Sequence, residues 1–64
     1  MTTLNNSQQR EISKALVYMA ELGKDYGARA ISALYRSARK TSQQHEILAI
    51  ARAYELIDSP EFIV

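Results

Sequence analysis

Residues 41–57 read TSQQHEILAIARAYELI, and this stretch decides the fold class. Its apolar residues return every three or four positions, which is the spacing of one face of an α-helix and not the alternation of a strand. Ser59-Pro60 follows where such a helix would end, because proline lacks the amide hydrogen that a helix needs. The stretch predicts a helix over about residues 42–58, with these side chains facing inward: Ile47, Ile50, Ala51, Tyr54 and Ile57.

The same period occurs twice earlier in the chain. A first helix is expected over about residues 7–22, ended by Gly23, because glycine is favoured just after a helix. A second is expected over about residues 26–39. No stretch shows sustained alternation, so we predict an all-α, compact three-helix bundle with a short C-terminal tail, forming a single domain over residues 1–64. The expected inner faces are Ile12, Ala15, Leu16, Met19 and Leu22 in the first helix, and Ala30, Ile31, Leu34 and Ala38 in the second.

Composition narrows the class of protein. The chain has 64 residues, no cysteine and one histidine, which excludes disulfides and argues against a structural zinc site. Hydrophobic residues make up 47% and charged residues 23%, as in folded globular proteins. No apolar run approaches the ~20 residues that span a bilayer, and the N-terminus lacks the features of a signal peptide. We therefore expect a cytoplasmic protein with no membrane association.

A short motif occurs twice, as SQQREI at residues 7–12 and SQQHEI at residues 42–47. Both copies stand where a helix is expected to begin. The spacing of Thr41 and Gln44 matches a capping box, in which side chains satisfy the free N–H groups of the first turn, and Asn6 and Gln9 nearly match it. We interpret the repeated motif as helix capping and not as a code for reading bases.

Charge is unevenly distributed along the chain. Residues 24–40 carry a net charge of +4 and residues 41–64 a net charge of −3. Arg29, Arg36 and Lys40 fall on one face of the second helix, opposite its apolar stripe, and we interpret them as a solvated basic ridge. A phosphate-binding surface is the alternative, although the pI of 8.1 is below the value of ~9 typical of nucleic-acid-binding domains.

Apolar residues on the third helix extend beyond one stripe. Ala49, Ala53 and Leu56 widen the apolar arc, and Leu48 stands apart from it. The tail adds Phe62-Ile63-Val64, whereas Val17 is a single apolar residue on the outer face of the first helix. Because so short a chain buries little surface, we predict that this excess contacts another protein. The predicted contact residues are Leu48, Ala49, Leu56, Phe62 and Ile63, with Tyr18 and Tyr35 at the margin.

Catalytic chemistry is not readable in the sequence. The only histidine, His45, falls in the first turn of a helix, and Glu55 with Asp58 supplies too few oxygen ligands for a calcium or magnesium site. We expect a non-enzymatic protein without cofactor or metal that binds another protein, modulates its activity or assembly, and forms a homodimer. The alternative is a helix-turn-helix transcriptional regulator. Its DNA-contacting residues would be Arg29, Arg36, Arg39, Lys40, Ser42, Gln43, Gln44 and His45.

Overall fold

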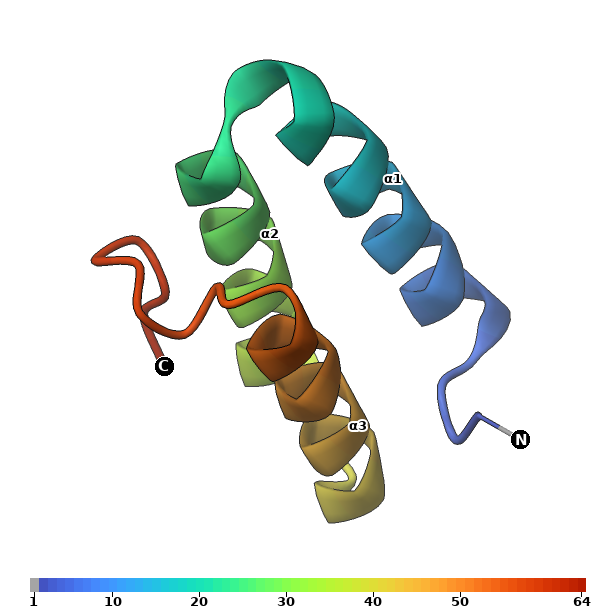
Figure 1. Cartoon of the computed structure of the whole chain (residues 1–64). Helices are drawn as coiled ribbons and strands as arrows, with labels where there is room; N and C mark the ends of the chain where they lie inside the picture. The colour runs from blue at the N-terminus through green and yellow to red at the C-terminus, as the bar shows by residue number, and fades with distance from the viewer. Residues whose placement is uncertain (1) are drawn as a thin grey trace.

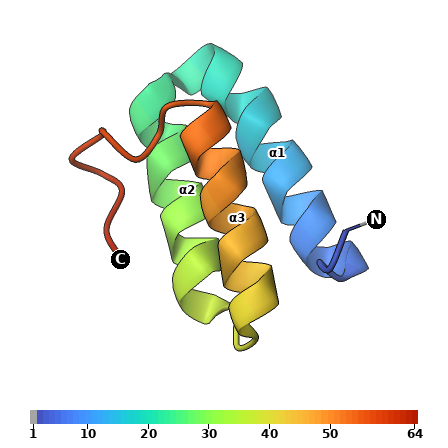
Figure 2. The same cartoon turned by 60° about the horizontal axis from the view of Figure 1, so that its bottom comes forward.

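Three helices and a C-terminal tail make up the fold (Figure 1). The computed structural model describes residues 2–64. The helices are α1 (Asn6–Leu22), α2 (Lys24–Ser37) and α3 (Thr41–Ala53), and no strand occurs within these residues. Tight connections at Gly23 and at residues 38–40 reverse the chain twice, so that α3 runs back beside α2 (Figure 2). The predicted all-α three-helix architecture is confirmed.

The second helix is the central element. Both α1 and α3 pack against α2, whereas within the described chain α1 and α3 do not pack directly against each other. The tail lies on the opposite side of α2 from α1 in both views (Figures 1 and 2). Helices α1 and α3 and the tail therefore all lie against α2.

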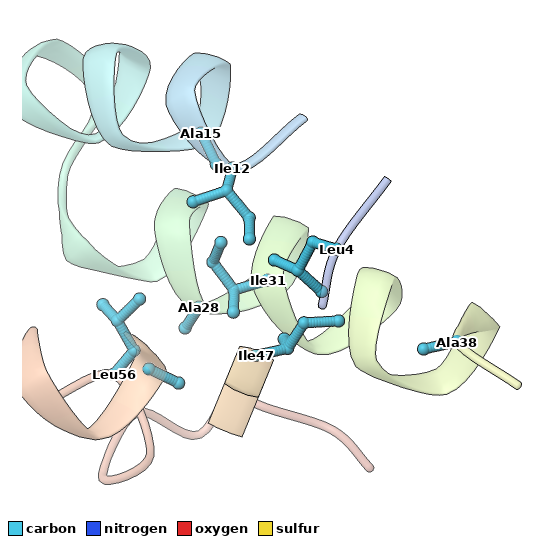
Figure 3. Packing of buried hydrophobic residues seen from close by; sticks show 9 residues of the cluster. Leu4, Ile12, Ala15, Ala28, Ile31, Ala38, Ile47 and Leu56 are labelled. Carbon is cyan, nitrogen blue, oxygen red and sulfur yellow. The ribbon is translucent and has the colours of Figure 1, made fainter. Parts of the chain in front are cut away.

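The core is small and centred on Ile31 of α2. Its side chain lies between those of Ile12 on α1 and Ile47 on α3 (Figure 3). Leu4, which precedes α1, points into the same cluster and is 6% exposed. Burying one such aliphatic side chain stabilises the fold by about 1.5–3 kcal/mol. The remaining core residues are small or lie at the ends of helices, and they are Ala15, Ala28, Ala38, Ala51 and Leu56.

Side-chain capping begins α1, but one residue earlier than the sequence suggested. Asn5 Oδ1 accepts from Gln8 N at 2.8 Å, and Gln8 Oε1 accepts from Asn5 N at 2.9 Å. The capping box therefore joins Asn5 and Gln8 and not Asn6 and Gln9. At the other end Gly23 has φ +96° and its N–H donates to Met19 O at 2.9 Å, as predicted for a residue ending this helix.

The second helix begins and ends two residues before the predicted positions. It starts at Lys24, which places Gly27 inside its first turns, where it is buried against α1. A Cβ on Gly27 would lie 2.6 Å from Met19 Sδ, so glycine permits the close approach of the two helices. The helix ends at Ser37 because Ala38 turns to an extended backbone, with ψ 133°, and enters the core.

The predicted capping box of the third helix is wrong. Its N-cap is Lys40, which makes no side-chain cap, and Thr41 is already the first helical residue. The Gln44 side chain donates instead to Ala38 O at 3.2 Å, across the turn between α2 and α3. This glutamine fixes the turn and does not satisfy the N–H groups of its own helix.

The third helix ends at Ala53 and not at residue 58, because a Schellman motif stops it. Leu56 N donates to Ala51 O at 2.8 Å, and Glu55 N donates to Arg52 O at 3.0 Å. The motif requires a left-handed residue, and Glu55 supplies it with φ +58°. Glycine usually fills that position, so the sequence carried no visible signal for this end. The reversal turns Leu56 into the core.

Candidate protein-binding surface

Three large apolar side chains are exposed on one side of α1. Val17 is 64% exposed, Leu22 61% and Tyr18 40%. Tyr18 and Leu22 are four residues apart and are therefore neighbours on the helix surface, whereas Val17 lies about 100° around the helix from Tyr18, on the outer face. The Tyr18 ring packs edge-to-face on Tyr26 with centroids 6.0 Å apart, which holds it against the end of the bundle. We call Val17, Tyr18 and Leu22 the α1 patch.

Sequence periodicity missed two members of the α1 patch. Leu22 was expected on the inner stripe, but it is the last helical residue before Gly23, where the chain turns away from the core. Val17 was expected to be an isolated surface residue. That the two residues belong to one exposed patch follows from the position of the end of α1 next to the first turn of α2, which only the structure gives.

Charged residues flank the α1 patch on the same outer face. Lys14 lies about one turn before Val17, and Glu21 lies about one turn after it. Both side chains are exposed, and no ion pair within residues 2–64 includes either one. The patch is therefore an apolar centre with one positive and one negative side.

The predicted contact residues do not form one surface. Leu56 is fully buried in the core, so it offers nothing to a partner, and that assignment is corrected. Tyr35 and Phe62 are half-buried and pack against the core, and Leu48 is half-buried. Ala49 on α3, Ile63 in the tail and Tyr18 on α1 remain exposed, on three different elements. The excess apolar arc was predicted for a helix that extends to residue 58, five residues beyond the observed end at Ala53.

One residue that was predicted to face inward on the third helix does not. Tyr54, expected on its inner stripe, is 48% exposed because the helix ends before it.

The C-terminal tail covers part of the expected basic ridge. Arg29 Nη2 pairs with Glu61 Oε1 at 2.9 Å, and Arg36 donates to the carbonyl oxygen of Ile63. These two arginines were expected to be free of partners on a solvated face. Their side chains stay largely exposed, but the acidic segment that follows the third helix already engages them.

Two glutamines of the proposed DNA-reading helix also have partners inside the chain. Gln43 Oε1 accepts from Gln8 Nε2 at 3.3 Å, and Gln43 Nε2 donates to Thr3 O at 3.3 Å. Gln8 and Gln43 occupy equivalent positions in the two SQQ motifs, so the repeat joins the first turns of α1 and α3. With Gln44 Nε2 bonded to Ala38 O, both glutamine side chains make hydrogen bonds within the chain.

The other candidate DNA contacts lie near the turn between α2 and α3. Ser42 and His45 are exposed, and Arg39 and Lys40 line an open pocket of about 540 Å³. The third helix runs back beside α2 (Figure 2), whereas the helices of a helix-turn-helix cross at roughly 90–120°. The remaining residues around the pocket are polar, namely Thr3, Asn5, Gln8, Ser37 and Gln43.

Residues 2–5, which precede α1, form an N-terminal arm that binds the third helix. This contact was not predicted from the sequence. The hydroxyl of Thr2 donates to Glu46, and Thr3 N donates to Glu46 Oε1 at 2.8 Å. These hydrogen bonds, that of Thr2 first, lower the pKa of the Glu46 carboxyl below its ordinary value. They hold the arm in the position from which Leu4 enters the core.

Among residues 2–64, no group of three or more histidine, cysteine or acidic side chains could hold a metal ion. None of the helices described is both long and apolar enough to cross a bilayer. Comparisons with protein-family models, curated proteins and solved structures find no match to this chain. Function must therefore be argued from the residues of the chain itself.

Proposed function

We propose that this chain is a non-enzymatic protein-binding module that forms a homodimer through the α1 patch and acts by occupying a surface of a partner protein. The observation that carries the proposal is the α1 patch, in which Val17 and Leu22 are each more than half exposed. Tyr18 and Leu22 are neighbours on the helix, and exposed apolar side chains that lie together favour association more than single scattered ones do. Tyrosine, which Tyr18 supplies here, is enriched at protein interfaces.

Charge complementarity favours a second copy as the occupant of the α1 patch. Two α1 helices packed antiparallel about a twofold axis between Val17 and Tyr18 bring Lys14 opposite Glu21 of the partner subunit. The same axis places Glu21 opposite Lys14 of the partner subunit, because a twofold interface contains each contact twice. The helix therefore complements itself, with apolar residues at the centre and opposite charges on either side.

Mass in solution tests the homodimer. Sedimentation equilibrium over a wide concentration range should give a monomer–dimer equilibrium for the wild type. Val17→Asp with Leu22→Asp should abolish the dimer, because it would bury uncompensated carboxylates at the interface. Ala49→Asp, on the exposed face of α3, is the matched control and should dimerise like the wild type.

A charge exchange tests the orientation. Lys14→Glu should weaken dimerisation by placing like charges opposite each other, and the double variant Lys14→Glu/Glu21→Lys should restore it. A wild type that stays monomeric at high concentration would refute the homodimer, and a double variant no better than the single one would refute the antiparallel arrangement.

DNA binding is the second candidate, and the pocket lined by Arg39 and Lys40 favours it. Cations that contact phosphates release counterions, so such binding weakens steeply with salt. A salt titration with mixed duplex DNA checks this candidate. A flat response up to high protein concentration at low salt would eliminate it.

A further inference from the structure

One face of α2 carries four polar side chains in a single stripe. Asp25, Arg29, Ser32 and Arg36 follow one another at intervals of four, three and four residues, so they lie in one line along the helix. This spacing is the one by which a helix presents a face to a ligand that lies along it. We call these four residues the α2 stripe.

All four residues of the α2 stripe contact the tail. Ser59 Oγ donates to Asp25 Oδ1 at 2.8 Å, near the start of α2. Further along, Arg29 pairs with the Glu61 carboxylate at 2.9 Å. The tail thus runs in the same direction as α2, with one contact for each turn or so of the helix.

The last two contacts are made to the backbone of the tail. Ser32 Oγ lies 3.4 Å from Glu61 O but donates over the shorter distance of 3.1 Å to Arg29 O of its own helix, and Arg36 donates to Ile63 O. Phe62, between these two carbonyl groups, is half-buried and packs against the core. The Ser59 hydroxyl, the Glu61 carboxylate and the Phe62 ring are specific to this sequence, whereas every peptide supplies carbonyl oxygens.

We propose that the α2 stripe is a docking surface for a short acidic segment of a partner protein, and that the tail of this chain occupies it as a competitor in cis. The ligand class is a peptide with a carboxylate for Arg29, an aromatic residue directly after it, and backbone carbonyls for Ser32 and Arg36. This surface is independent of the α1 patch and of the homodimer proposed above, because the tail and α1 lie on opposite sides of α2 (Figure 1).

A nucleic acid fits the α2 stripe less well than a peptide. Asp25 accepts a hydrogen bond from Ser59, and its carboxylate would repel a phosphate placed there. The contacts of Ser32 and Arg36 are to single carbonyl oxygens and not to a bidentate anion. The bound tail itself shows the chemistry that the stripe accepts.

The tail is suited to release. The Arg29 side chain is 71% exposed, and an ion pair so accessible to solvent is weak and screened by salt. The segment is tethered to the chain, so its local concentration near the stripe is of millimolar order, and a partner peptide must compete with that value. Changing Glu61 to lysine removes this pair and adds repulsion from Arg29, so the tail and its half-buried Phe62 should leave the stripe more often.

A peptide titration of the full chain tests the proposal. The probe is the acetylated peptide IDSPEFIV, which copies residues 57–64, titrated into isotope-labelled protein while amide chemical shifts are recorded. Glu61→Lys releases the tail by placing two cations opposite each other, and Glu61→Gln is a milder second variant should the first fail to fold. Glu11→Lys, with the same charge change on the exposed face of α1, is the matched control.

The expected result is saturable binding of the peptide to the Glu61 variants, with the shifted amides along α2. Wild type and Glu11→Lys should bind about tenfold more weakly, since their own tails compete. Arg29→Ala in the Glu61→Lys background, or a probe with lysine in place of its glutamate, should lose the binding. The dimer equilibrium of the α1 patch should not change.

Three outcomes would overturn the proposal. The first is a folded Glu61 variant without saturable shifts at millimolar peptide. The second is equal binding by wild type and variant, which would mean that the tail does not compete. The third is duplex DNA shifting the α2 amides of the Glu61 variant where the peptide does not. A wild type that proves monomeric would contradict the homodimer and leave this proposal standing.

Discussion

Among residues 2–64, Glu55 is the only residue other than glycine with a positive φ, at +58°. A residue with a side chain destabilises the fold by about 1–2 kcal/mol when it adopts this conformation. Glycine avoids this cost, but it loses more backbone entropy on folding, so replacing the residue with glycine regains only part of that free energy. Glu55→Gly should therefore raise the free energy of unfolding by about 0.5–1 kcal/mol, measured by urea denaturation. Ala49→Gly, in the exposed middle of α3, should lower it by about 1 kcal/mol. Equal effects of the two changes would contradict the Schellman motif.

Leu56 is the residue that this turn delivers to the core. Because its side chain is fully buried, Leu56→Ala should destabilise the fold by about 2–5 kcal/mol through lost contacts and a residual cavity. Val64→Ala, at a position 70% exposed, should change stability by less than about 0.5 kcal/mol. Thermal denaturation followed by circular dichroism distinguishes the two, and a small effect at Leu56 would place that residue at the surface, as the sequence had suggested.

The N-terminal arm shows how a single carboxylate positions a whole segment. Hydrogen bonds from Thr2 and Thr3 lower the pKa of Glu46, so its ionised form is favoured in the folded chain over the unfolded one. The contribution of Glu46 to the free energy of unfolding is therefore fully present at pH values above the ordinary carboxyl pKa. It is lost as the pH falls through the lower pKa that Glu46 has in the folded chain. Urea midpoints measured against pH should show this acid loss in the wild type, and Glu46→Gln should reduce it.

Glu11→Gln, on the exposed face of α1, is the control for that pH series and should retain the acid loss of the wild type. A Glu46→Gln profile that fell as steeply with acid as the wild type would mean that the arm is not held by this carboxylate.

Close approach of α1 and α2 depends on a glycine inside a helix. In Gly27→Ala the new methyl group would meet Met19 Sδ at 2.6 Å, although alanine favours the helix by about 1 kcal/mol. Shortening Met19 to alanine removes the clash, so Gly27→Ala should be more favourable in a Met19→Ala background than in the wild type. A double-mutant cycle of unfolding free energies measures this coupling. Additive effects would show that the methionine moves aside without cost.

Sequence periodicity predicts this fold well where local rules act alone. The three helices and the end of α1 at Gly23 follow from apolar spacing and from the conformational freedom of glycine. The end of α3 does not, since a glutamate replaces the usual glycine at Glu55 and the burial of Leu56 compensates for it. Long-range partners were equally invisible: Thr2 and Thr3 reach Glu46 across more than forty residues. The α1 patch was missed although the end of α1 was predicted, because Leu22 was placed on the inner stripe and Val17 was interpreted as a single surface residue.

Helix packing among residues 2–64 is centred on α2, although a Gln8–Gln43 hydrogen bond also joins α1 to α3, so the fold depends strongly on one core side chain of α2. A domain of this size has a total stability of about 3–10 kcal/mol. Ile31 lies between Ile12 and Ile47 (Figure 3), so Ile31→Ala, at about 2–5 kcal/mol, should remove much of that stability and loosen α1 and α3 together. Amide hydrogen exchange should then quicken to a similar extent in both helices. If α1 and α2 kept their protection while α3 alone lost it, the molecule would be a helical hairpin with an added helix, and Ile31 would not be the common centre.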